Sequence, residues 1–112
     1  MIDLLYYLGA AALGGLIGYG VGSLLVKYLD KAKEWFNRVW RGLSRVSRAI
    51  GILVRQGNRL FKRFVAQLFN GEVEEYYDEN DVGVEIKWSE LSDEAKKALE
   101  DDEFLVIETY GS

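Results

Sequence analysis

The acidic stretch from Asp78 to Gly83 has the residue types and spacing that come closest to a metal site. Asp78, Asn80 and Gly83 stand at positions 1, 3 and 6 of a calcium-binding loop, where oxygen ligands and a turn-forming glycine belong. Positions 5 and 12 normally supply another oxygen ligand and a bidentate carboxylate, but here they hold Val82 and Ser89. We therefore expect no metal at this stretch and interpret its carboxylates as part of a solvated acidic surface.

Other catalytic chemistry has little support in the composition. The chain of 112 residues contains no cysteine and no histidine. This excludes disulfides and thiolate chemistry, and it removes the commonest metal ligand and the commonest acid–base group near neutral pH. Paired carboxylates can act as acid and base, but nothing in the sequence indicates a pocket around them. We expect neither an enzyme nor a bound cofactor.

Charge is distributed unevenly along the chain, although the formal net charge is only −4. Residues 27–63 hold eleven basic and two acidic side chains, a net charge of +9. Residues 64–112 hold three basic and fifteen acidic side chains, a net charge of −12. Because such a chain is best interpreted segment by segment, we divide it into residues 1–29, 30–70 and 71–112.

The N-terminal segment is apolar enough to cross a membrane. Between Asp3 and Lys27 lie 23 consecutive uncharged residues. A helix of that length spans roughly 35 Å, and the hydrocarbon core of a bilayer is about 30 Å thick. A secretory signal peptide normally begins with basic residues, which this N-terminus lacks. A buried soluble helix or hairpin is the other alternative. We predict a transmembrane helix within residues 1–29.

Small residues recur every fourth position in this segment, at Ala10, Gly14, Gly18 and Gly22. On a helix these positions lie on one side and form a groove through which another helix backbone can approach closely. The pattern resembles the glycine zippers of self-associating and pore-forming membrane helices. The resemblance implies a packing face for copies of the same chain or for a different membrane protein. A generic anchor that never pairs is the alternative.

The residues that flank the apolar run predict its orientation. Tyr6 and Tyr28 lie near its two ends, where interfacial aromatic residues collect. The N-terminal flank has no basic side chain, whereas the other flank begins with Lys27 and Lys31. Since basic residues favour the cytoplasmic side, we expect an integral membrane protein with its N-terminus outside and its C-terminus in the cytoplasm.

Residues 30–70 have the pattern of a long basic amphipathic helix. Apolar residues recur at heptad spacing from Phe36 onward, and Gly57 followed by Asn58 is the expected bend. A second face of the same predicted helix carries basic residues, namely Arg38, Arg41, Arg45, Arg48, Arg55, Arg59 and Lys62.

Three partners could contact this predicted basic face. An interfacial helix would place its arginines on anionic lipid headgroups. A bundle between subunits would bury the heptad stripe. Nucleic acid would be attracted by the charge, but no recognition fold or stacking platform accompanies it. We therefore predict contact with anionic lipid or with a protein partner, and we do not expect nucleic acid.

The acidic C-terminal segment, residues 71–112, predicts a small ββαβ unit. Ser92 is a candidate N-cap, with Asp93 and Glu94 in the first turn of the helix that follows. The expected elements are a strand over 72–77, a strand over 82–88, a helix from 93 to about 100 and a strand over 104–110. So short a unit buries little apolar surface on its own, so it should lean on the preceding helix or on a neighbouring subunit.

Together these segments predict a mainly α protein with an N-terminal transmembrane helix, a long basic amphipathic helix and an acidic α+β unit. The expected function is that of a small single-pass membrane protein that assembles into a homo-oligomeric ring, pore or scaffold. A membrane-permeabilising effector is one member of this class. The alternative is an accessory or adaptor subunit that binds a soluble partner through its acidic end.

Overall fold

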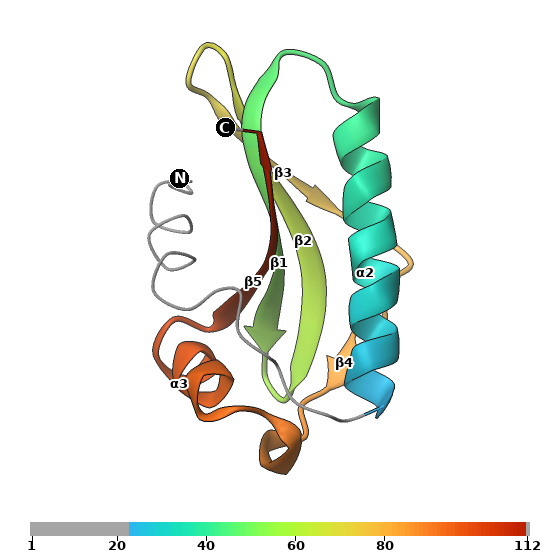
Figure 1. Ribbon diagram of the computed structural model, residues 1–112, viewed down its shortest axis with the longest axis vertical. Helices are drawn as coiled ribbons and strands as arrows, with labels where there is room; N and C mark the ends of the chain where they lie inside the picture. The colour runs from blue at the N-terminus through green and yellow to red at the C-terminus, as the bar shows by residue number, and fades with distance from the viewer. Residues whose placement is uncertain (1–22, 112) are drawn as a thin grey trace.

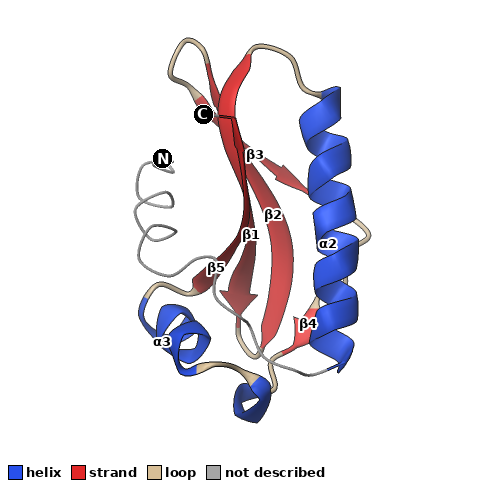
Figure 2. Cartoon of the chain, viewed as in Figure 1, coloured by secondary structure: helices blue, strands red, loops and turns tan. Residues whose placement is uncertain are grey.

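The computed structural model describes residues 23–111 and shows one antiparallel sheet beside one long helix (Figure 1). Among the described elements helix α2 comes first, four of the five strands follow it, and the short helix α3 precedes the last strand (Figure 2). The elements are α2 (Ser23–Gly42), β1 (Val46–Gln56), β2 (Arg59–Leu68), β3 (Val73–Tyr77), β4 (Val84–Glu85), the 3-10 turn η2 (Trp88–Glu90), α3 (Asp93–Asp101) and β5 (Phe104–Gly111).

The sheet is built around the hairpin of β1 and β2. Its strand order is β3-β2-β1-β5, and β4 pairs with β2 beside β3. All of these pairs are antiparallel. The β1–β2 turn consists of Gly57 and Asn58, with Gln56 paired to Arg59. Gly57 has a φ of 62°, and glycine accepts this conformation without steric cost in a two-residue hairpin turn.

Helix α2 packs its apolar side along the sheet. Ala32 and Phe36 are completely buried. A side chain at Gly51 of β1 would overlap the Phe36 ring, so this glycine is what lets the helix approach the central strand. At the far end of the helix, Trp40 stacks on Tyr110 of β5 with ring centroids 5.3 Å apart. The helix therefore packs against the sheet from its middle to its C-terminal end.

The sheet has apolar clusters on both of its faces. Helices α2 and α3 contribute to the first cluster, which includes Phe36, Leu53, Phe64 and Leu99. The second cluster lies on the opposite face of the strands, because its residues alternate along each strand with those of the first. Its buried members are Ile50, Ile52, Val65, Phe104 and Val106.

The prediction of a mainly α protein with a long basic helix is wrong. The helix ends at Gly42, and much of the remaining predicted helix forms strands β1 and β2. Burial explains the error: Ile50, Ile52 and Leu53 are all completely buried, so β1 has buried side chains on both of its faces. An apolar run of this kind does not alternate, so its spacing also fits a helix. The observed fold is α+β, with a helix followed by a five-stranded antiparallel sheet and a short helix.

The local predictions for the acidic end agree better with the structure. Strand β3 lies within residues 72–77, and β5 covers residues 104–110. The Ser92 hydroxyl accepts a hydrogen bond of 3.2 Å from the Ala95 amide and caps α3. Over residues 82–88, however, only the two-residue β4 is a strand. No helix within residues 23–111 has the length and hydropathy needed to cross a bilayer.

Candidate functional site

The first turns of α2 form a surface where the apolar N-terminal run meets the folded domain. The run of uncharged residues extends to Val26, and α2 already begins at Ser23. Leu24 is 58% exposed and Val26 is 43% exposed. Leu25, between them, is buried against the sheet. Two large apolar side chains therefore face outward at the point where the chain enters the domain.

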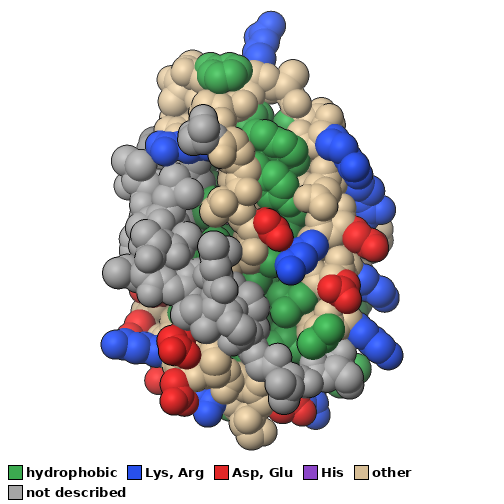
Figure 3. Space-filling model, viewed as in Figure 1, with side chains coloured by type: hydrophobic (Ala, Val, Ile, Leu, Met, Phe, Trp, Pro, Cys, Tyr) green, Lys and Arg blue, Asp and Glu red, His purple; other side chains and the backbone are tan. Residues whose placement is uncertain are grey.

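The outer side of α2 is basic. Lys27, Lys31, Arg38 and Arg41 are exposed and recur at intervals of three, four or seven residues, so they share one side of the helix. We call these four residues the α2 basic face. Lys and Arg side chains gather along this edge of the molecule (Figure 3). Asp30 and Glu34 of the same helix are also exposed and offset part of this charge.

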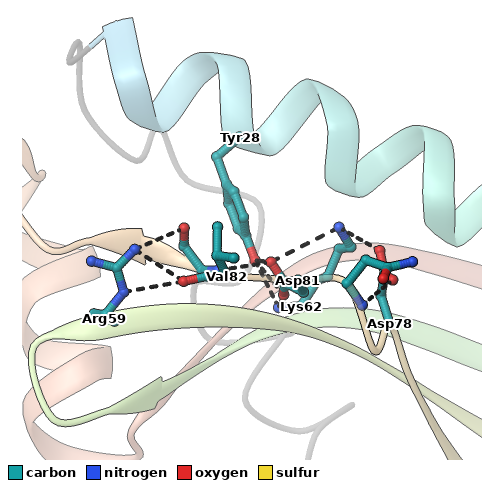
Figure 4. Close-up of polar contacts among 8 residues, drawn as sticks. Tyr28, Arg59, Lys62, Asp78, Asp81 and Val82 are labelled. Carbon is teal, nitrogen blue, oxygen red and sulfur yellow. Dashed lines mark hydrogen bonds and ion pairs between the residues drawn. The ribbon is translucent and has the colours of Figure 1, made fainter.

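A polar network ties the start of α2 to the sheet (Figure 4). The Tyr28 hydroxyl donates to the Asp81 carboxylate, at 2.8 Å to Oδ1 and 2.7 Å to Oδ2. The backbone N–H of Lys62 on β2 lies 3.0 Å from the Tyr28 oxygen and 2.9 Å from Asp81 Oδ2. Burial, followed by the hydrogen bond to Asp81, raises the pKa of Tyr28, so this side chain remains a neutral donor. The network joins α2, β2 and the β3–β4 loop.

The Lys62 ammonium extends the same network. It lies 3.0 Å from Asp78 Oδ2 and 4.0 Å from Asp81 Oδ1. It also lies 5.7 Å from the centre of the Tyr28 ring and 5.8 Å from that of Trp35. The hydrogen bond from Lys62 is the main cause that lowers the pKa of Asp78. Asp78, the first position of the calcium-like pattern, is thus paired with a lysine, and the nearby Asp81 is bound by the Tyr28 hydroxyl.

The β3–β4 loop is fastened at a second point by Arg59. Its guanidinium donates to the Val82 carbonyl, at 2.9 Å from Nη2, and to the Gly83 carbonyl at 3.2 Å. Gly83 has a φ of 73°, and a side chain there would overlap the Leu60 carbonyl. Within residues 23–111 no cluster of acidic side chains has an arrangement that could hold a metal ion.

The structure separates the seven basic residues that the sequence placed on one helix face. Arg38 and Arg41 belong to the α2 basic face, and Arg45 is exposed in the α2–β1 connection with a φ of 62°. The other four lie on strands β1 and β2, where each contacts other parts of the domain. Their partners are Gln67 for Arg48, the Leu99 carbonyl and the Trp88 ring for Arg55, the Val82 and Gly83 carbonyls for Arg59, and Asp78 for Lys62.

The predicted helix-packing residues Ala10, Gly14, Gly18 and Gly22 lie outside the described residues. The contact of Tyr28 with Asp81, 53 residues away, was not predicted from the sequence, which assigned Tyr28 to a membrane interface. The one available signal was an aspartate within a turn-forming stretch, and such a residue usually bonds only to its own loop.

Comparison of the chain with protein-family models, with curated proteins and with solved structures finds no match.

Proposed function

We propose that this chain is a membrane-anchored protein that self-associates through its glycine-rich segment and carries the α+β domain at the membrane surface. The uncharged run over residues 4–26 would supply the anchor. The small residues Ala10, Gly14, Gly18 and Gly22 would supply the packing face between copies. The oligomer would be a ring, pore or scaffold, and no enzyme activity is part of the proposal.

The outward-facing start of α2 is the observation that carries this proposal. Leu24 and Val26 belong both to the uncharged run and to the folded domain, and both are exposed. Leaving large apolar side chains in water forgoes about 1.5–3 kcal/mol for each one that could be buried. A bilayer that begins at this turn would remove both from water. The domain would then follow its anchor with no intervening linker.

The charges next to this turn support the same arrangement. Lys27 of the α2 basic face follows directly after Val26, Lys31 lies about one turn later, and both are exposed. Basic residues close to an anionic leaflet each contribute about 1 kcal/mol of attraction. Headgroup contact by these residues would place the domain on the cytoplasmic side and the N-terminus outside, in accordance with the positive-inside rule.

Substitution within the glycine pattern tests self-association. Gly18→Leu fills the groove with a bulky side chain and adds hydrophobicity, so insertion should be retained while the oligomer is lost. Gly20→Leu is the matched control, because Gly20 lies half a turn away from the pattern. Chemical cross-linking in membranes should show the oligomer ladder for the parent and for Gly20→Leu only. An unchanged ladder in Gly18→Leu would contradict the zipper.

An adaptor role is the second candidate, and an acidic surface favours it. Glu100, Asp101 and Glu103 are exposed at the end of α3. These carboxylates would attract a basic soluble partner, while the glycine face would dock on a different membrane protein. The purified mass in mild detergent separates the two candidates. A discrete homo-oligomer supports assembly, and a monomer supports the adaptor.

A further inference from the structure

The second apolar cluster, on the sheet face opposite α2, is as deeply buried as the main core. Ile50, Ile52 and Val65 are 0% exposed, and Phe104 and Val106 are 5% and 2% exposed. Partly buried Val54 and Val73 border them. These side chains come from β1, β2, β3 and β5, so the cluster extends across the width of the sheet.

The described helices do not explain that burial. The buried apolar residues of α2, such as Ala32 and Phe36, belong to the first cluster. Those of α3, Ala95 and Leu99, belong to the same first cluster. Within residues 23–111, the second cluster contains strand residues alone. A β-sheet face left in water does not reach such low exposure, so this face needs a covering layer, and the described helices contribute no residue to the cluster.

We propose that this face is the docking site of the chain's own apolar segment, residues 4–22, when no membrane holds it. The segment has nineteen residues and no charge. As a helix it would be roughly 28 Å long, comparable to the roughly 36 Å of an eleven-residue strand such as β1. The start of α2, which follows the segment, lies at the same end of the sheet as the β1–β2 turn (Figure 1). A reversal of a few residues there leads directly onto the second face.

The docked segment would complete a three-layer arrangement of helix, sheet and apolar segment. The small residues of the segment suit it to this place, because they allow close approach to a flat face of β-branched side chains. The bilayer is then a competing location for the same residues. This competition depends on the proposed function, whereas docking on the sheet does not.

Photo-cross-linking of the full chain tests whether residues 4–22 occupy this face of the sheet. A diazirine-bearing aliphatic amino acid replaces Ile52 in protein made by lipid-free cell-free synthesis, and the cross-linked peptides are mapped by mass spectrometry. Position 53 is the matched control, since Leu53 is equally buried but belongs to the α2-facing cluster. We expect position 52 to link to residues 4–22 at monomer mass, and position 53 to link to α2.

A second pair of positions guards against a variant that fails to fold. Val65 and Phe64 are neighbours on β2, are equally buried and belong to opposite clusters. Position 65 should link to residues 4–22 and position 64 to α2. Links from 52 and 65 at doubled mass, to a second copy, overturn the proposal. Absence of any link to residues 4–22, while 53 or 64 links to α2, also overturns it.

Vesicles separate this inference from the proposed function. Adding vesicles of phosphatidylcholine and phosphatidylglycerol should reduce the link from position 52 to residues 4–22 several-fold, as the protein becomes resistant to alkaline extraction. A persistent link in protein that stays out of the membrane supports docking and contradicts membrane anchoring. Extraction-resistant protein that never shows the link in lipid-free synthesis contradicts docking and leaves the anchor in place.

Discussion

The basic residues of α2 and those of the β1–β2 hairpin differ in what surrounds them, although one sequence pattern predicted a common role for both. Arg38 and Arg41 are exposed on the outer side of the helix. Arg55 and Lys62 lie over aromatic rings, and Lys62 pairs with Asp78. Only the first group is presented to a large partner such as a membrane. The comparison shows that a net charge of +9 in the sequence leaves an exposed basic surface only where the side chains do not contact other parts of the domain.

Undocking α2 from the sheet should have the largest effect, because the packed domain positions both groups of basic residues. Phe36→Ala removes a completely buried ring that lies against Gly51. We expect a loss of about 3–5 kcal/mol in the free energy of unfolding. Urea unfolding in mild detergent, followed by tryptophan fluorescence, measures it. Arg38→Ala, on the exposed side of the same helix, should change stability by less than about 0.5 kcal/mol.

Removing Asp81 should have the next largest effect. Its side chain accepts hydrogen bonds from Tyr28, from the Lys62 amide and from the Gly83 amide. Because hydrogen bonds to a charged group contribute about 1.5–3 kcal/mol, Asp81→Ala should cost a similar amount in the same unfolding experiment. Asp30→Ala, an exposed carboxylate on α2, is the control. Equal stability of the two variants would show that the network does not hold α2 in place.

Neutralising the two groups of basic residues separately should show which of them contacts anionic lipid. A polarity-sensitive dye on Glu34→Cys, which is unique because the chain has no cysteine, reports on the outer side of α2 in proteoliposomes. Arg38→Gln with Arg41→Gln should weaken its response to anionic lipid, by about 1 kcal/mol for each residue. The same charge change at Arg48 and Arg55 should have far less effect. Equal responses would refute a surface formed by α2 alone.

The smallest expected effect concerns pH and the Lys62–Asp78 pair. The neighbouring ammonium lowers the pKa of Asp78 in the folded state. The pair therefore stabilises the fold above the unfolded pKa of about 3.9, and this stabilisation is lost as pH falls through the lower folded value. The Asp78 side chain keeps 22% of its surface in contact with solvent, and an ion pair with such contact contributes about 1 kcal/mol. Asp78→Asn should flatten the acid limb of a stability-against-pH curve by that small amount.

The sequence alone determined the elements whose signals are local. Ser92 caps α3 as predicted, because a serine followed by acidic residues satisfies and complements the first turn of a helix. Residues 104–110 were likewise predicted to form a strand, and β5 confirms this prediction. On α2 the amphipathic pattern was correct as far as Gly42, and Arg38 and Arg41 are exposed as a helical pattern requires.

Only the tertiary structure decided that residues 46–68 form two strands and not a helix, and which partners their side chains contact. Heptad spacing from Phe36 continues through Ile50 and Leu53, yet these residues are buried on opposite faces of one strand. A strand covered on both faces has no alternation that distinguishes it from a buried helix. The contact of Tyr28 with Asp81 joins residues 53 positions apart, and only the folding of α2 onto the sheet brings them together. A cap or a helical pattern acts through neighbouring residues of the same segment. Strand formation in residues 46–68 and the Tyr28–Asp81 contact depend instead on segments that are distant in the sequence.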